Sequence, residues 1–379
     1  MTPDEIGTPF AALRWVARLI VALAVVAAVV TATGYRWGPE RHWLLAFLQY
    51  LPYPVHLAPA LAAVALSLVL GRLWRLAALA ALVLVVWPVM GLEIRPGDPA
   101  DGRRTVRVMT YNIKSHEAME RPGGYARLAQ EVDSHDADIV VFQNAAEPSA
   151  LRRLGQTPVA ALLGTRHRRA LGEFVIASRF PLRDCERPAM PSGGAAQPYA
   201  RCVADIDGFE IDLYAVHLAT PRHALVATRR EALDGVDEWQ RNIAERMAQA
   251  EALARDVRGR TRPVVLAGDF NAPDTSLVMR ALREAGLRNA FSVAGRGYGH
   301  TYGHSLRPGI SFLRIDHVLV APPFGVAAAY AGGDAGSPHR PFVADLLIPP
   351  AGAQAGAESD ARFAGIIDPH PVMSGPPPR

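Results

Sequence analysis

The stretch Ala267-Gly-Asp-Phe-Asn271 decides how the rest of this sequence is interpreted. It follows an apolar run, Pro263-Val-Val-Leu-Ala267, and precedes the turn residues Ala272-Pro-Asp-Thr-Ser276. A short apolar run that ends at a turn is typical of a buried strand. Residues two apart on an extended chain point to the same face, so Asp269 and Asn271 can face one bound group. We therefore expect a carboxylate and an amide at one end of a buried strand.

Hydrophobic residues make up half of the 379-residue chain but are distributed unevenly, which favours more than one structural unit. We expect a membrane region at residues 1–92, a linker at 93–104, a globular domain at 105–348 and a disordered tail at 349–379. The tail is rich in Pro, Gly and Ala, a composition that disfavours a packed core. The formal net charge is +4 and no dense run of basic residues occurs, so charge alone does not indicate nucleic acid.

Three apolar runs in the membrane region predict about three transmembrane helices. The runs are Leu19–Thr33, Val55–Leu70 and Leu76–Leu92, and with their flanks each reaches the roughly 20 residues that span a bilayer. A signal peptide would explain the first run, because Arg14 and Arg18 precede it, but not the other two. Buried helices of a soluble protein are the alternative, which the length of the runs disfavours.

Arginines beside these runs predict the orientation in the membrane. Arg14 and Arg18 precede the first run, and Arg72 and Arg75 fill the short turn between the second and third runs. Both places lie on the same side of the membrane if all three runs cross it. The positive-inside tendency assigns that side to the cytoplasm. The domain that follows would then lie in the periplasm, attached to a bacterial inner membrane.

The two cysteines, Cys185 and Cys202, lie in segments that we expect to be neighbouring strands. Cysteines on neighbouring strands can form a disulfide if their Cβ atoms meet. A disulfide would suit an oxidising compartment. Two unpaired buried thiols agree equally well with the sequence, so both interpretations are kept.

Polar residues recur at the ends of the strands expected within the globular domain. They are Asn112, Gln143, Asn144, His217, Asp269, Asn271, Asp316, His317 and His339. Each of these alone is more often a turn former or a satisfied polar group than a ligand. Several strand ends that converge on one edge of a sheet can nevertheless build a rigid site. Their succession within one domain therefore predicts a functional site.

Seven short motifs carry these residues, and their order and spacing resemble the endonuclease/exonuclease/phosphatase superfamily. That superfamily includes DNase I, apurinic endonucleases, inositol-polyphosphate phosphatases and neutral sphingomyelinases. The resemblance covers residues 105–348 and implies an α/β fold, a four-layer α+β sandwich of two packed mixed β-sheets flanked by helices. The motifs are Met109-Thr-Tyr-Asn-Ile113, Asp138-Ile-Val-Val-Phe-Gln143, Ser178-Arg-Phe-Pro181, Val216-His-Leu218, Gly268-Asp-Phe-Asn271, Ile315-Asp-His317 and Ser337-Pro-His-Arg-Pro341.

The resemblance also implies hydrolysis of a phosphoester by an activated water. Asp269 would orient or deprotonate this water. Asn271 would hold the water or a phosphate oxygen, while His217 and His339 would contact the phosphate as charge builds on it. Asp316 would accept a hydrogen bond from the other ring nitrogen of His339, fixing its tautomer and favouring its charged form.

A divalent cation, Mg²⁺ or Mn²⁺, would polarise a phosphate oxygen and stabilise the leaving group in such a reaction. The resemblance implies Asn112, Asn144 and Asp269 as the residues of its site. Two departures weaken that site: Asn144 replaces the family's principal glutamate ligand, and Pro338 replaces an aspartate. A neutral amide is a weaker ligand than a carboxylate for a hard cation. Glu147 could supply a carboxylate nearby, although a place on a loop surface is the simpler expectation.

Two other groups of residues are weaker candidates. His300 and His304 have a spacing that would suit a metal site on a helix, but their Gly-rich surroundings predict a loop, where contact with a substrate is the alternative. The basic cluster Arg166-His-Arg-Arg169 is expected either to be solvated or to contact an anion.

The sequence thus predicts a membrane-anchored phosphoester hydrolase, either a phosphodiesterase or a phosphatase. One alternative is a catalytically impaired pseudoenzyme that binds a phosphate ligand or serves as a scaffold, because Asn144 and Pro338 remove two carboxylates. An activity unrelated to phosphate is the third interpretation. Phospholipid headgroups and envelope phosphates would lie within reach, and nucleic acid is equally compatible with the fold. The sequence defines neither the substrate nor the oligomeric state.

The predicted orientation has a direct test. Alkaline phosphatase fused to the C-terminus should be active in bacterial cells, because three crossings from a cytoplasmic N-terminus leave the domain outside. A whole-cell phosphatase assay measures this. A fusion that is expressed but inactive would overturn the periplasmic placement.

Overall fold

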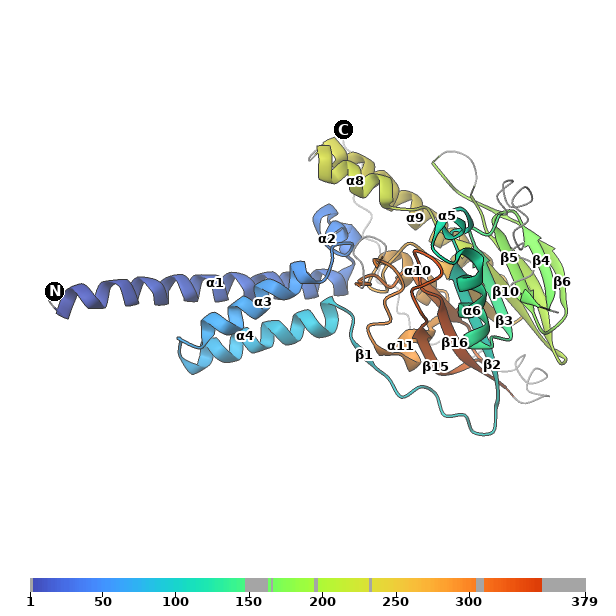
Figure 1. Ribbon diagram of the computed structural model, residues 1–379, viewed down its shortest axis with the longest axis horizontal. Helices are drawn as coiled ribbons and strands as arrows, with labels where there is room; N and C mark the ends of the chain where they lie inside the picture. The colour runs from blue at the N-terminus through green and yellow to red at the C-terminus, as the bar shows by residue number, and fades with distance from the viewer. Residues whose placement is uncertain are drawn as a thin grey trace, which may run out of the picture.

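The computed structural model describes residues 3–146, 163–164, 166–193, 197–231, 234–304 and 310–349. The expected tail therefore lies outside the described residues, apart from Pro349. Apolar helices of the N-terminal region project from one side of an α/β domain (Figure 1). They are α1 (Pro3–Trp37), α3 (Pro54–Ser67), α4 (Arg72–Leu84) and the π-helical turn η2 (Val85–Val89) that continues α4.

Two segments among the described residues are long and apolar enough to cross a membrane. They are Ala11–Trp37, with 27 residues, and Arg72–Val89, with 18. The intervening α3 has 14 residues and rises about 21 Å, short of the roughly 30 Å hydrocarbon core of a bilayer. It is shorter than the predicted run Val55–Leu70 because the chain leaves the helix after Ser67. The expectation of about three spans is therefore supported for two helices.

The domain contains two six-stranded mixed sheets, as predicted. Each sheet has one parallel ladder, which joins β10 to β11 in the first sheet and β2 to β3 in the second. The other described ladders of both sheets are antiparallel. The first sheet has the order β12 (Arg288–Asn289), β14 (Asp316–Val320), β11 (Val264–Asp269), β10 (Phe209–His217), β9 (Ala200–Ile206), β6 (Leu182–Glu186). The second has the order β15 (Gly325–Ala331), β16 (Phe342–Ile348), β2 (Arg104–Asn112), β3 (Ile139–Gln143), β5 (Phe174–Ser178), β4 (His167–Leu171).

Helices on the outer faces complete four layers, which confirms the predicted sandwich. α6 (Gly124–His135) packs on the second sheet, and α9 (Asp234–Arg258) and α10 (Leu277–Glu284) pack on the first. Between the sheets lies one apolar core, in which alternate residues of β2 and β10 point inward because side chains alternate along a strand. The remaining short elements are α5 (Ser115–Glu120), α11 (Ala290–Ala294) and the two-residue pairs β1 (Glu93–Ile94) with β13 (Arg296–Gly297) and β7 (Ala189–Met190) with β8 (Gln197–Pro198).

Helix α8 (Arg222–Glu231) folds back against the start of α9. A Cβ atom on Gly235 would stand 2.4 Å from the carbonyl carbon of Ala227 and 2.5 Å from the amide nitrogen of Thr228. Only glycine allows the two helices to approach so closely. The hydroxyl of Thr228 donates to the Gly235 carbonyl at 3.2 Å across the same contact. As a result, α8 lies on the side of the domain that faces the apolar helices (Figure 1).

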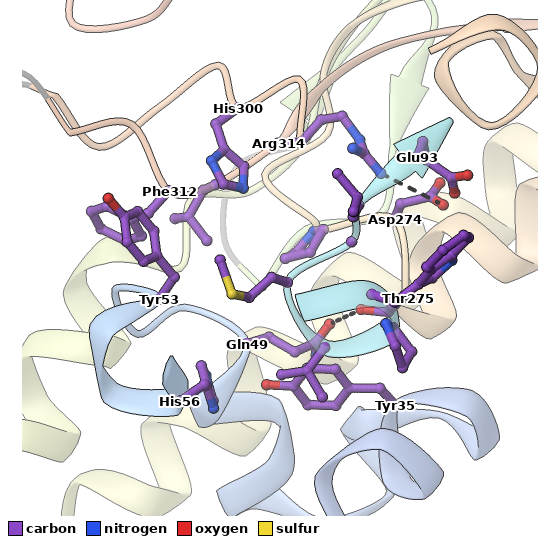
Figure 2. A pocket seen from close by; sticks show the side chains of 18 of the residues that line it. Tyr35, Gln49, Tyr53, His56, Glu93, Asp274, Thr275, His300, Phe312 and Arg314 are labelled. Carbon is purple, nitrogen blue, oxygen red and sulfur yellow. Dashed lines mark hydrogen bonds and ion pairs between the residues drawn. The ribbon is translucent and has the colours of Figure 1, made fainter. Parts of the chain in front are cut away.

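The connection between α1 and α3 also packs on the domain. It contains the short helices η1 (Pro39–Arg41) and α2 (Trp43–Leu48). The indole of the fully buried Trp239 donates to the carbonyl of Trp43 at 3.0 Å. Thr275 donates to the side chain of Gln49 at 3.0 Å beside a junction cavity of about 150 Å³ (Figure 2). The N-terminal helical region and the domain are thus joined by specific contacts in addition to the linker between them.

Cys185 of β6 and Cys202 of β9 form a disulfide between neighbouring strands. Of the two alternatives kept from the sequence, the structure has the bonded one. The bond closes a loop with a sequence separation of 17 residues. Disulfides persist in oxidising compartments, so this bond agrees with a domain outside the cytoplasm.

Candidate active site

The predicted site residues meet at one edge of the two sheets. His217 ends β10, Asp269 ends β11 and Asp316 begins β14, and the strand register pairs His217 with Asp269 and Asp269 with Asp316. Asn112 arrives from the end of β2 in the other sheet, and His339 from the loop before β16. Ligand sites of α/β sheets commonly lie at such carboxyl ends of parallel strands.

Asp269 stands at the centre of this arrangement and is almost completely buried. One carboxylate oxygen accepts from the Asn112 amide at 2.9 Å, and the other accepts from the backbone N–H of Asn271 at 2.9 Å. Asn271 adopts a φ of 47°, a left-handed conformation that asparagine tolerates. Its own amide group donates to the Leu218 carbonyl at 2.9 Å, which ties the Gly268-Asp-Phe-Asn271 motif to the end of β10.

Two imidazoles flank the Asp269 carboxylate. Its Oδ2 atom lies 3.7 Å from Nε2 of His217 and 3.8 Å from Nε2 of His339. Each histidine is oriented by a different carboxylate through its other ring nitrogen. Nδ1 of His339 bonds Asp316 at 3.0 Å, and Nδ1 of His217 bonds Glu173 at 2.9 Å.

The two histidines have opposite electrostatic environments. Burial lowers the pKa of His339 and outweighs the nearby charge of Asp269. Burial also raises the pKa of its partner Asp316. For His217, burial alone would lower the pKa, but the hydrogen bond that it donates to Glu173 and the charge of Asp269 raise it overall. These directions favour the protonated form of His217 and the neutral form of His339, whereas the resemblance implied a charged His339, because burial opposes the charge of Asp269.

Glu173 is a site residue that sequence reasoning missed. It occupies the turn Leu171-Gly-Glu-Phe174 between β4 and β5, and this turn lies against the end of β10. Burial would raise the pKa of Glu173, but the hydrogen bond and charge of His217 hold it below its usual range. The sequence offers no signal beyond an acidic residue in a tight turn, because the contact depends on how two sheets pack.

The residues predicted to hold a metal are brought together but bond one another. Nδ2 of Asn144 donates to Oδ1 of Asn112 at 2.9 Å, and Nδ2 of Asn112 donates to Asp269 at 2.9 Å. Asn144 has a φ of 49°, a conformation that favours asparagine over glutamate. Glu147, the possible substitute carboxylate, lies outside the described residues.

A second donor set nearby suits a divalent cation. Asp269, Asp316 and His339 are buried, and each offers one ligand atom within 4.8 Å of the others. Oδ1 of Asp316 is buried and has no hydrogen-bond partner among the described residues. Carboxylate oxygens and an imidazole nitrogen are accepted ligands of Mn²⁺, and carboxylates of Mg²⁺. The residues present therefore fit a cation, at a place displaced from Asn144.

A cleft of about 700 Å³ opens above these residues and is lined by Asp269, Asn271, His339 and Lys114. Lys114 is the single lysine of the chain, and sequence reasoning gave it no role. Burial has the largest influence on the pKa values of Glu173, His217, Asp316 and His339, and the positive charge of Lys114 acts on all four as well. The cleft thus contains a fixed cation beside its carboxylates.

The weaker candidates lie around the site rather than in it. His304 bonds the Ser337 carbonyl at 3.0 Å and so supports the loop that carries His339. His300 bonds the Ser311 carbonyl at 3.0 Å and stacks against Tyr53 and Tyr298. It lines the junction cavity (Figure 2). In the basic cluster, Arg166 donates to the carbonyls of Leu163 and Ala137, which is a structural role.

This four-layer fold with Asp, Asn and two His residues at one sheet edge agrees with the superfamily that the seven motifs resemble. The chain belongs to the Endonuclease/Exonuclease/phosphatase family, whose family model matches residues 109–339. Members of that family are phosphoester hydrolases and generally depend on divalent metals. No curated protein matches the chain.

Solved structures of the same fold have low sequence identity to this chain. One is an endonuclease/exonuclease/phosphatase from Beutenbergia cavernae DSM 12333, at 23% identity over 65% of this chain and 72% of that chain, with a TM-score of 0.48. Another is a family protein from Bacteroides thetaiotaomicron, at 18% identity over 65% and 99%, with a TM-score of 0.47. A third is sphingomyelinase C from Streptomyces griseocarneus, at 18% identity over 64% and 99%, with a TM-score of 0.45.

The Glu173–His217 pair generates a prediction about protonation. Glu173→Gln keeps the size of the side chain but removes its charge, so the pKa of His217 should fall. Nuclear magnetic resonance titration of the histidine rings measures this, with the His217 signal assigned by its loss in His217→Ala. Glu117→Gln, at another cleft carboxylate, is the matched control and should leave His217 unchanged. An unaltered His217 pKa in Glu173→Gln would refute the pairing.

Proposed function

We propose that the protein is a membrane-anchored phosphoester hydrolase that uses a divalent metal, Mg²⁺ or Mn²⁺, with Asp269, Asn271, His217, Asp316 and His339. The observation that carries the proposal is the buried Asp269 carboxylate between two imidazoles, each held by its own acid. Perturbed titratable groups that line a cleft are typical of catalytic sites.

The distances support a role for Asp269 and His339 in holding the attacking water. Their facing atoms are 3.8 Å apart, which is too far for a direct hydrogen bond but suits one oxygen atom held by both. His339 is neutral, and Asp316 accepts from Nδ1–H, so the lone pair of Nε2 faces the water. A neutral imidazole in this tautomer can accept a proton.

In the proposed reaction, only the imidazoles of His339 and His217 transfer protons. The water oxygen bonds to phosphorus while the bond from phosphorus to the leaving alcohol oxygen breaks. Nε2 of His339 takes one proton of the water, and the imidazolium of His217 gives one to the leaving oxygen. Proton exchange with solvent resets both rings. Two histidines with separated protonation preferences suit this division of base and acid.

A bound divalent cation would be held by the carboxylates of Asp269 and Asp316, with Asn112 and Asn144 nearby, and would supply Lewis-acid stabilisation of the phosphate charge, which leaves Nε2 of His339 for the water. Lys114 and protonated His217 stabilise the same charge from the chain itself. For the membrane region, we propose inner-membrane anchoring with the domain in the periplasm. The disulfide and the flanking arginines support that placement.

A phosphate-binding module without turnover is the second candidate function. The bonding of Asn144 to Asn112, the neutral Pro338 and the cation Lys114 favour it, because together they reduce the negative charge available to a metal. Phosphate would still find an ammonium, two imidazoles and the Asn271 amide in such a pocket. The two candidates differ in turnover and not in binding.

Hydrolysis of bis(p-nitrophenyl) phosphate by the full chain in detergent, with Mg²⁺ or Mn²⁺, tests the first candidate. Asp269→Ala and His339→Ala should each lower the rate by about 100-fold or more, because water activation is lost. Asp133→Ala and His167→Ala, at exposed positions, are matched controls and should retain it. A wild-type rate no higher than that of the two site variants would sink the enzyme proposal and leave the binding module.

Metal affinity provides a second test, in which the two missing carboxylates are restored. The double variant Asn144→Glu, Pro338→Asp should bind Mn²⁺ about ten-fold more tightly or better by calorimetry, because two charged ligands are added. Gln240→Glu adds a charge on exposed helix surface and should not change the affinity. Equal affinity before and after the double substitution would contradict our account of Asn144 and Pro338.

A further inference from the structure

The outer wall of the candidate active-site cleft is built by the membrane region. Phe47, Tyr50, Leu51 and Pro52 line the same cleft as Asp269 and the other site residues. These four residues lie in α2 and in the turn after it, between the ends of α1 and α3. In Figure 1, that segment stands where the apolar helices meet the domain. The cleft therefore opens beside the segment that joins the apolar helices to the domain.

This wall is held rigidly against the active site. The hydroxyl of Tyr50 donates to the Asn271 carbonyl at 2.9 Å, and the Arg246 guanidinium donates to the same carbonyl at 3.0 Å and to the Tyr50 hydroxyl. Burial raises the pKa of Tyr50 to about 12, so the hydroxyl keeps its proton. Arg246 also lies over the rings of Tyr50 and Trp239. The membrane-side wall and the catalytic motif thus share one buried network.

One face of α8 forms a second wall of the cleft. Arg222, Leu225, Val226 and Arg229 line the cleft, and their spacing of three and four residues places them on one side of the helix. Val226 is 38% exposed although it is apolar. The side chains of Arg222 and Arg229 are exposed and form no ion pair within the described parts of the chain. An apolar strip edged by two arginines therefore faces the membrane-side wall.

The chemistry of the cleft changes from its floor to its mouth. The floor has the Asp269 carboxylate, the His339 imidazole and the Lys114 ammonium. Both walls are apolar, through Phe47 and Leu51 on one side and Leu225 and Val226 on the other. The two arginines add positive charge where the cleft would meet lipid headgroups. A water-soluble phosphoester would leave these apolar walls in contact with water. An amphiphile would cover the walls with its apolar part and place its phosphate at the polar floor.

We propose that the substrate is an anionic membrane phospholipid, whose phosphoester reaches Asp269 while the first part of its acyl chains lies on the apolar walls. This inference rests on the proposed function and adds the substrate class. Arg222 and Arg229 recognise the negative surface from which the lipid comes. The membrane helices fix the distance between that surface and the site, because the wall that they carry is bonded to Asn271.

The test uses the full chain in nanodiscs of phosphatidylcholine, with or without phosphatidylglycerol. Products of lipid hydrolysis are measured by mass spectrometry beside hydrolysis of bis(p-nitrophenyl) phosphate. Wild type should cleave phosphatidylglycerol. Val226→Asp should lower the ratio of lipid to soluble-ester hydrolysis by about ten-fold or more, because an acyl chain would meet a charge. Arg222→Gln and Arg229→Gln should each lower it about five-fold.

Matched controls are Ile94→Asp, an exposed apolar residue outside the cleft, and Arg258→Gln on the exposed surface of α9. Both should keep the wild-type ratio. Cleavage of the soluble ester or of an oligonucleotide, with no cleavage of lipid or with a ratio that the cleft variants do not alter, would overturn the lipid assignment and leave the hydrolase proposal standing.

If no ester is cleaved, a binding measurement distinguishes failure of the hydrolase proposal from failure of the lipid assignment. Calorimetry with dihexanoyl-phosphatidylglycerol in detergent should show binding to wild type that Val226→Asp weakens about ten-fold. Binding without turnover of any ester would reject the hydrolase and retain the lipid assignment. Absence of binding together with absence of turnover would reject both.

Discussion

The close parallel contact between β10 and β11 is the constraint on which the site depends. A Cβ atom on Gly268 would stand 1.9 Å from the carbonyl oxygen of Val216, so no other residue fits between these strands. The contact sets His217 beside Asp269 and brings Asn271 close enough to bond Leu218. Each further partner, from Asn112 to Tyr50, then bonds an atom whose place this pairing has fixed. Gly268 has no reactive side chain, but the close approach that it allows sets the positions of the reactive side chains beside it.

The sequence predicts the sandwich and the identity of its edge residues because both follow from local patterns. Apolar runs that end in polar residues are local, and so is the Gly268-Asp-Phe-Asn271 motif. What local patterns do not contain is the packing of one sheet against the other. Glu173 reaches His217 only because a turn of the second sheet covers the end of the first. The charge state of His339 likewise depends on burial from all sides, which no spacing in the sequence reveals.

The helical region shows the same division between composition and geometry. Its apolar runs predict apolar helices, two of which are long enough to cross a membrane. Helix ends depend on the backbone, and α3 ends at Ser67 before the apolar run does. The position of α8 was equally hidden, since it follows from the close approach at Gly235. In charge terms, the site combines the buried carboxylates of Asp269 and Asp316 with one lysine that lines the cleft.

The hydrogen bond from Tyr50 to Asn271 joins a residue before the family match to a residue within it, so the packing of the domain extends beyond the matched segment. The family match begins at residue 109, yet Trp239, fully buried, is covered by residues near Trp43. A chain cut at the start of the family match would uncover that indole and remove the hydroxyl that the Arg246 guanidinium bonds. The packed unit is thus longer than the segment that matches the family model.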